Sequence, residues 1–167
     1  MRHSLVELNR MSQEEFVRVV GPVFEHSLWI AAEVAGRRPF ANMDEMHRQL
    51  CQAVRVAPQE KQLGLIKAHP DLAARGTLTA ESTREQTSAG LNKLQAEEKS
   101  AIQSQNQAYR EKFGFPFVIC ARLNNKDSIV EAFTRRLTHS REEEIQTALE
   151  EIFKIAALRL RDLCQPD

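Results

Sequence analysis

The sequence has little of what disulfide cross-links and metal centres require. Its 167 residues include three cysteines, and these stand far apart at Cys51, Cys120 and Cys164. An odd and scattered set neither builds a disulfide framework nor supplies the paired spacing of a zinc site. A reducing compartment is the simplest expectation, so we expect the protein to be cytoplasmic.

The formal net charge is zero, because 23 Lys and Arg residues balance 23 Asp and Glu residues. The chain therefore has no global field that would attract nucleic acid or an anionic membrane. No apolar run approaches the roughly 18 residues of a membrane helix, and the N-terminal segment lacks the apolar core of a signal peptide. We expect a soluble protein that is not exported and that binds neither nucleic acid nor membrane.

Motifs for covalent and cofactor chemistry are missing as well. The sequence has no phosphate-binding glycine loop, no nucleophile elbow around a serine, and no cysteine with a neighbouring histidine. His47 and Cys51 are four residues apart on a predicted helix, but a zinc site needs at least one more protein ligand and no companion motif occurs. We expect no metal ion, and acid-base chemistry is left as the better-supported class.

What the sequence does contain is a series of helix signals. A polar residue followed three positions later by Glu is typical of a helix start, because each side chain can bond a free backbone N–H group. Such pairs are Ser12/Glu15, Asn42/Glu45, Ser82/Glu85, Ser128/Glu131 and Ser140/Glu143. Pro58 suits a first helical position, and Gly36, Gly90 and Gly114 follow helical stretches as stop signals. The predicted helices are 13–25, 27–35, 43–55, 58–68, 82–90, 96–113, 128–138 and 141–163.

A single segment, "FPFVICA" at 115–121, has the composition of a strand. One strand has no partner with which to form a sheet. The connecting segments are short, and no linker, low-complexity tract or repeat separates parts of the chain. We therefore predict an all-α fold in which residues 1–167 form a single domain, a bundle of about eight helices with one short extended segment and no sheet.

The last predicted helix carries an apolar stripe that leads to an arginine. The stripe consists of Ile145, Leu149, Ile152, Ala156 and Leu163. Continuing from Ala156 by the same spacing gives Arg159. A buried and unpaired guanidinium would cost several kcal/mol, so Arg159 either extends outward to water, pairs with a carboxylate, or binds an anionic ligand.

His69 and Pro70 form a second candidate position. Proline forces its predecessor out of the helical region, so the imidazole should project at a junction between helices. A helix C-terminus favours the charged imidazole and suits a group that gives or takes a proton. The alternative is structural: His69 caps a turn and Pro70 starts the next helix.

A polar turn follows a short distance downstream. The spacing of Ser82 and Glu85 is explained by a helix cap alone, without a ligand. Gln86 adds an amide donor and acceptor that a cap does not require. Because free N–H groups are also present at a helix start, this turn could bind a ligand rich in carbonyl and N–H groups.

Three segments together resemble one family. They are "AHPDLA" with "LTAESTREQTSAGL" (68–73 and 78–91), "YREKFGFPFVICARLNNKDSIVEAFTRRL" (109–137) and "EIFKIAALRLRDL" (151–163). In this order they resemble 2-oxo-4-hydroxy-4-carboxy-5-ureidoimidazoline (OHCU) decarboxylase of the bacterial type. That family catalyses the last step from urate to (S)-allantoin in purine catabolism.

The resemblance implies an all-α, typically homodimeric enzyme that needs no metal or organic cofactor and acts on a small-molecule substrate. It implies catalytic roles for His69, Glu85 and Arg159. It further implies substrate-binding roles for Pro70, Ser82, Gln86, Phe117, Val118, Ile119, Cys120 and Ala121. The extended segment would contribute backbone groups that bind the ring and ureido amides.

One departure and two alternatives accompany the resemblance. The interval from His69 to Ser82 is shorter than in many relatives, with "LAARG" at 72–76, which affects the expected loop and access to the pocket.

A non-catalytic helical interaction module would look similar outside the three motifs. A hydrolase or isomerase acting on a related ureido compound would keep the site and change the reaction. The central prediction is that His69, Glu85 and Arg159 converge on one pocket.

Overall fold

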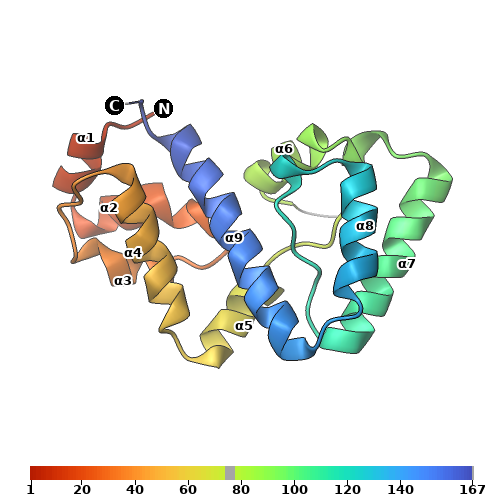
Figure 1. Ribbon diagram of the computed structural model, residues 1–167. Coiled ribbons are helices and arrows are strands. Elements are labelled where there is room, and N and C mark those ends of the chain that lie inside the picture. Colours follow the sequence, from red (N-terminus) through yellow and green to blue (C-terminus); the bar gives the residue numbers. More distant parts are fainter. Residues whose placement is uncertain (74–77, 167) are drawn as a thin grey trace. The chain divides into compact units, whose positions relative to one another are not determined.

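The chain divides into two compact units in a computed structural model that describes residues 1–73 and 78–166. Unit 1 contains Met1–Ala68 and the residues from Phe153 onward, and unit 2 contains His69–Ile152. The long helix α9 (Arg141–Leu163) supplies residues to both units (Figure 1). That residues 1–167 form a single domain stays a prediction.

The regular elements are α-helices joined by short 3-10 turns. Apart from α9, unit 1 contains α1 (Leu5–Arg10), α2 (Gln13–Val20), η1 (Gly21–Val23), α3 (Trp29–Ala35), α4 (Met43–Arg55) and α5 (Gln59–Lys67). Apart from α9, unit 2 contains α6 (Ala80–Ser88), η2 (Leu91–Lys93), α7 (Ala96–Phe113), η3 (Ala121–Leu123) and α8 (Lys126–Arg136).

The prediction of an all-α fold without a sheet is confirmed. Over residues 1–73 and 78–166 the backbone forms nine α-helices, where about eight were expected, and no strand. His3 and Cys164 form an isolated bridge within unit 1. No helix in the same residues is long and apolar enough to cross a membrane.

Several helices begin at the residues that the sequence indicates. The side chains of Ser12, Asn42 and Ser140 each accept a hydrogen bond from the backbone N–H three residues later, at 3.1, 2.8 and 3.2 Å. The same arrangement starts α1: Ser4 Oγ accepts from the Glu7 backbone N–H, and the Ser4 backbone N–H donates to Glu7 Oε2. This short helix was missed, although its cap has the pattern used to find the others.

Three predicted helix starts are wrong by two residues. Helix α3 begins at Trp29, two residues later than predicted. The caps are Thr79 for α6 and Asn125 for α8, and both helices begin two residues earlier than predicted. The backbone N–H of Ser82 donates to Thr79 Oγ1 at 3.1 Å, and that of Ser128 donates to Asn125 Oδ1 at 3.0 Å. Ser82 therefore lies inside the first turn of α6, and its predicted capping box with Glu85 is not formed.

Prolines account for two further corrections. Helix α2 ends at Val20 and does not continue to residue 25, because Pro22 in the following η1 turn has no backbone N–H to donate. Pro58 is the cap residue of α5, one position before the predicted place. Residues 74–77, within the interval predicted to be shorter than in relatives, lie outside the described residues.

Unit 2 has an aromatic core. The rings of Phe117 and Phe133 stack with centroids 3.8 Å apart, and Tyr109 meets Phe117 edge to face at 5.2 Å. All three side chains are almost completely buried. The segment predicted as extended runs without regular structure to Cys120, after which Ala121 begins η3.

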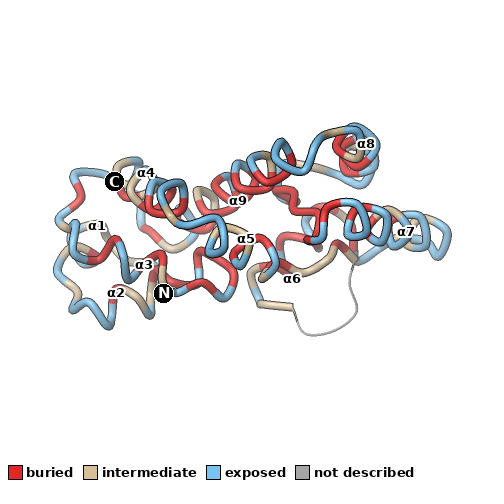
Figure 2. The backbone as a smooth tube through the Cα atoms, turned by 90° about the horizontal axis from the view of Figure 1, so that it is seen from below, coloured by how far each residue is buried: buried red, intermediate tan, exposed pale blue. Residues whose placement is uncertain are grey.

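Helix α9 has buried and exposed residues alternating along its length (Figure 2). The buried set includes four predicted stripe positions, namely Ile145, Leu149, Ile152 and Ala156. Leu163, the fifth, is half-buried. The apolar stripe is therefore confirmed except at its last residue.

Candidate active site

His69 lies immediately after the end of α5 and is 6% exposed. Helix α5 ends at Lys67, and Ala68 caps it by donating its N–H to the Gly64 carbonyl at 3.0 Å. Pro70 does not start a helix, because residues 70 and 71 have no regular structure, residues 72 and 73 form a turn, and the next described helix is α6. The prediction that Pro70 starts a helix is therefore wrong, whereas the position of His69 beyond a helix end is confirmed.

The turn after His69 is tied to two helices of unit 2. The backbone N–H of Ala73, which has a positive φ of 54°, donates to Gln86 Oε1 at 3.0 Å. Asn106 Nδ2 on α7 donates to the Leu72 carbonyl at 3.0 Å. These bonds fix the polypeptide that leaves His69 against α6 and α7.

Three polar side chains are buried on α6. Ser82, Glu85 and Gln86 are 6%, 8% and 9% exposed. Their spacing of three and four residues places them on one side of the helix. Burying polar groups costs free energy unless they are hydrogen-bonded, so a concentration of them on one short helix is typical of a site that binds a polar ligand.

The segment 117–121 is buried throughout, with Phe117, Val118, Ile119, Cys120 and Ala121 at 0–7% exposure. Several of its backbone groups have protein partners. The Val118 carbonyl accepts from Arg136 Nη1 at 2.7 Å, and the Cys120 carbonyl accepts from Asn124 Nδ2 at 2.9 Å. Helix α6 packs against η3, which contains Ala121. Unit 2 thus brings α6, the helix that carries the buried polar residues, against the end of this segment.

Arg159 belongs to unit 1 and is 6% exposed. Its Nη2 donates to Glu25 Oε1 at 2.8 Å, and its Nη1 lies 3.4 Å from the carbonyls of Pro22 and Val23. Of the alternatives, extension into water is wrong and pairing with a carboxylate is found. Since Arg159 lies in unit 1 and His69 and Glu85 in unit 2, their convergence on one pocket stays a prediction.

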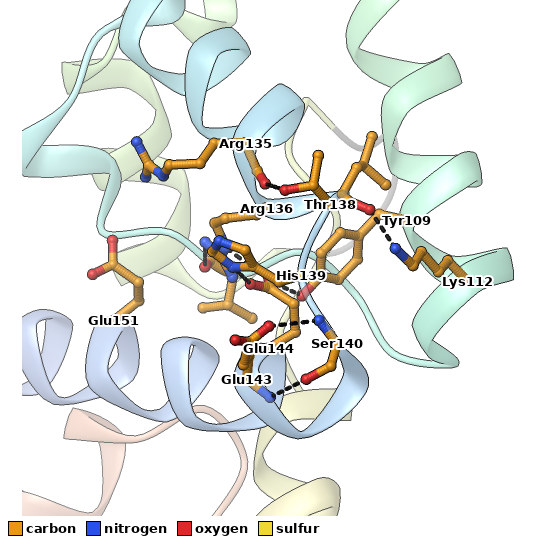
Figure 3. A network of polar contacts seen from close by, with 12 residues as sticks. Tyr109, Lys112, Arg135, Arg136, Thr138, His139, Ser140, Glu143, Glu144 and Glu151 are labelled. Atoms are coloured by element: carbon orange, nitrogen blue, oxygen red, sulfur yellow. Dashed lines mark hydrogen bonds and ion pairs between the residues drawn. The ribbon is translucent and has the colours of Figure 1, made fainter.

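Sequence reasoning missed Glu25 and a buried ionic cluster in unit 2. The cluster consists of the buried residues Tyr109, Arg136 and Glu144 together with the half-buried His139 (Figure 3). The sequence does contain a pattern that could have identified two residues of this cluster. Arg136 continues the apolar stripe of α8, and Glu144 precedes Ile145 at the start of the stripe of α9. A charged residue on an apolar helix face indicates a buried ion pair.

Other features are separate from the predicted site residues. A shallow hollow of about 510 Å³ is lined by His139, Glu142, Glu143, Gln146 and Thr147. In unit 1, His47 Nε2 contacts the Phe153 carbonyl at 2.8 Å and Cys51 Sγ at 3.4 Å. Over residues 1–73 and 78–166, no three His, Cys, Asp or Glu side chains are grouped so that they could hold a metal ion.

Comparison with known proteins identifies the family. The OHCU decarboxylase family matches residues 9–161. The OHCU decarboxylase of Halalkalicoccus jeotgali is 42% identical over 165 residues, covering 99% of this chain and 94% of the relative. That of Amia calva is 44% identical over 163 residues, covering 95% of this chain and 93% of the relative.

A solved structure also resembles the whole chain. The crystal structure of (S)-allantoin synthase has a TM-score of 0.79 at 25% identity and covers 96% of this chain. This chain spans 54% of that longer protein. The family predicted from the three motifs is thereby confirmed: the chain belongs to the OHCU decarboxylase family.

Proposed function

We propose that the protein is a carboxy-lyase that converts OHCU into (S)-allantoin and CO2, the last step of urate oxidation. Membership of the family supports this reaction, together with relatives of that name that match over nearly their full length. The structural observation that carries it is the row of buried polar side chains, Ser82, Glu85 and Gln86, beside the turn that follows His69.

The chemistry of the substrate explains how little the protein must supply. In OHCU one ring carbon carries hydroxyl and carboxylate, and its neighbour carries the ureido group and a double bond to a ring nitrogen. Loss of CO2 leaves an electron pair that forms a double bond between these carbons, while the C=N pair moves to nitrogen and takes a proton. The hydroxyl then gives up its proton to become a carbonyl, and the ureido carbon gains a proton on one face.

His69 is proposed as the group that moves the proton between the hydroxyl and the ureido carbon. At 6% exposure it is shielded from water, and a shielded base keeps the carbanion equivalent from being protonated at random by solvent. Pro70 fixes the backbone next to it. The protein thereby determines which face of the ureido carbon receives the proton.

The buried groups of α6 are proposed to bind the ureido group and the ring. Glu85 accepts hydrogen bonds from N–H groups, Gln86 offers an amide donor beside its bond to Ala73, and Ser82 contributes a hydroxyl. Backbone groups of 117–121 complete the contacts to the ring. Such contacts orient the leaving carboxylate for reaction.

Arg159 is proposed to bind an anionic oxygen of the substrate. Its guanidinium has five N–H donors, and Glu25 holds the group in place through Nη2. This role requires Arg159 to come close to His69. We further propose that the enzyme is a cytoplasmic homodimer and uses neither metal nor organic cofactor.

The reaction is tested by supplying freshly generated OHCU to the purified protein. We expect its decay to accelerate with protein concentration and one CO2 to be released for each allantoin formed. Decay at the spontaneous rate would refute the proposal. Accelerated decay without CO2 release would favour instead a hydrolase or isomerase acting on the same ureido compound.

A further inference from the structure

An ionic cluster around Glu144 contacts segment 117–121, which is proposed to bind substrate. The side chains of Arg136 and Glu144 are 2% and 0% exposed. Arg136 Nε donates to Glu144 Oε1 at 2.8 Å. The same oxygen accepts from Tyr109 Oη at 2.5 Å, and Glu144 Oε2 lies 2.9 Å from His139 Nδ1 (Figure 3). Three side chains from α7, α8 and the α8–α9 connection thus meet one carboxylate.

Stability alone is a weak reason for such a cluster. Removing two charges from water costs several kcal/mol for each ion, and an apolar replacement of similar volume is often equally stable or more stable. Within residues 1–73 and 78–166, Arg136 Nη2 is also buried and has no hydrogen-bond partner. A pair retained at this cost calls for a role beyond the packing of unit 2.

Two further contacts of the Arg136 guanidinium go to the start of segment 117–121. Its Nη1 donates to the Val118 carbonyl at 2.7 Å, and its guanidinium carbon lies 4.2 Å from the centre of the Phe117 ring. Phe117 is also stacked on Phe133 of α8. The arginine therefore fixes both the backbone and the side chain at the start of segment 117–121.

The far end of the segment is fixed independently. The Cys120 carbonyl accepts from Asn124 Nδ2 at 2.9 Å, and the Cys120 N–H lies 3.4 Å from Glu151 Oε1. Ile119 lies between these two anchors. A shift of Val118 would therefore rotate the peptide groups on either side of Ile119, which belong to the part proposed to contact the substrate ring.

We propose that Arg136, held by Glu144, is a positioning residue that sets the place of the Val118–Cys120 backbone for substrate binding. This inference rests on the proposed function of segment 117–121. Tyr109 helps to hold Glu144 by donating a hydrogen bond to it. Burial, and then this bond, raise the pKa of the Tyr109 phenol, so the hydroxyl keeps its proton at neutral pH and remains a donor.

The test compares two neighbouring arginines on α8. Arg136→Lys keeps the charge opposite Glu144, but one ammonium cannot reproduce the guanidinium fork that donates to both Glu144 and Val118 and lies flat on Phe117. Because ring contacts act in the ground state and the transition state alike, KM should rise by about tenfold or more and kcat should change less. Arg135→Lys, at an exposed position, is the matched control and should behave like the parent enzyme.

A second variant covers the case in which Arg136→Lys does not fold. Tyr109→Phe removes one donor to Glu144 and keeps the ring that meets Phe117. Tyr109→Phe should also raise KM, by a smaller factor than Arg136→Lys. Folded Arg136→Lys with the KM of Arg135→Lys would overturn the inference, as would an unchanged KM for Tyr109→Phe if the lysine variant does not fold. A parent protein without activity on OHCU would instead overturn the proposed function.

Discussion

Among individual residues, His69 has a distinctive setting, because it is buried immediately beyond the end of a helix. The chain that follows it is fastened through Ala73 to Gln86. An imidazole in this setting can exchange a proton with a bound ligand while bulk water is largely excluded. These observations make His69 the residue on which the proposed mechanism depends most.

We predict that His69→Asn abolishes most of the activity. A positioned acid-base group contributes about 10² to 10⁴ in rate, so kcat should fall by that order, with a smaller change in KM. Steady-state kinetics on fresh OHCU measures the loss, and the melting temperature checks that the variant is folded. A folded variant with nearly parental turnover would remove His69 from the mechanism.

A second prediction for a single residue concerns Arg159→Lys. A lysine can keep the charge near Glu25, but it cannot also provide a planar fork of donors to the substrate. Loss of a hydrogen bond to a charged group costs about 1.5–3 kcal/mol, which corresponds to roughly a 10- to 150-fold weaker interaction. We therefore expect KM for OHCU to rise by about this factor.

The measurement must separate substrate binding from the structural pair with Glu25. Kinetics are recorded well below the melting temperature of the variant. If KM and kcat match those of the parent while the melting temperature falls, Arg159 acts only through its ion pair. Sequence position could single out Arg159 on its helix, but it could not identify Glu25, because 134 residues separate the two.

Secondary structure elements were easier to predict than contacts, and the late predicted starts of α6 and α8 share one cause. At α6 and α8, two cap patterns overlap three residues apart: Thr79 precedes Ser82, and Asn125 precedes Ser128. Both patterns satisfy the local rule. The chain adopts the earlier start in each case, which lengthens the helix and gives more backbone groups a partner.

The role of Thr79 as the cap of α6 leads to a prediction. Thr79→Ala should lower the free energy of unfolding by about 1 kcal/mol through loss of the cap. Ser82→Ala keeps that cap, because the bond at this residue is donated by its backbone N–H. If Ser82 binds substrate, Ser82→Ala should raise KM. Denaturant unfolding and kinetics on both variants distinguish the roles, and equal KM values for Ser82→Ala and the parent would remove Ser82 from the site.

For the whole molecule, the helix-start patterns and the lack of a second strand-like segment were sufficient to predict the fold class. An isolated strand-like segment cannot form a sheet, and the described residues contain none. The division into two units was not predicted, because no linker marks it and α9 contributes to both. The predicted convergence of Arg159 and His69 concerns residues of different units, and no local sequence pattern encodes it.

A prediction for the molecule as a whole concerns acid. Hydrogen bonds from Ser140 hold the pKa of Glu143 below its usual value, and Lys126 and Gln95 do the same for Glu98. Carboxylates with a pKa lowered on folding stabilise the native state above their unfolded pKa of about 4.5 and lose this effect as pH falls through the folded value. The melting temperature should therefore drop on acidification below about pH 5.

Glu143→Gln tests this contribution. The variant should melt lower than the parent at neutral pH, and the difference should shrink as the pH falls toward 3, since the parent loses its advantage there. Glu142→Gln is the matched control on the same turn, because Glu142 takes no part in the Ser140 cap. A difference between Glu143→Gln and the parent that stays constant from pH 7 to pH 3 would contradict the account.

The handedness of the product tests the central claim most directly. Loss of CO2 makes the two reacting ring carbons planar, so protonation in free solution gives both enantiomers of allantoin equally. A protein whose His69 delivers the proton to one face should give (S)-allantoin in excess, measured by circular dichroism while the enzyme outpaces spontaneous decay. We expect a strong (S) signal from the parent and its loss in His69→Asn. Racemic allantoin from the parent at high protein concentration would contradict the account.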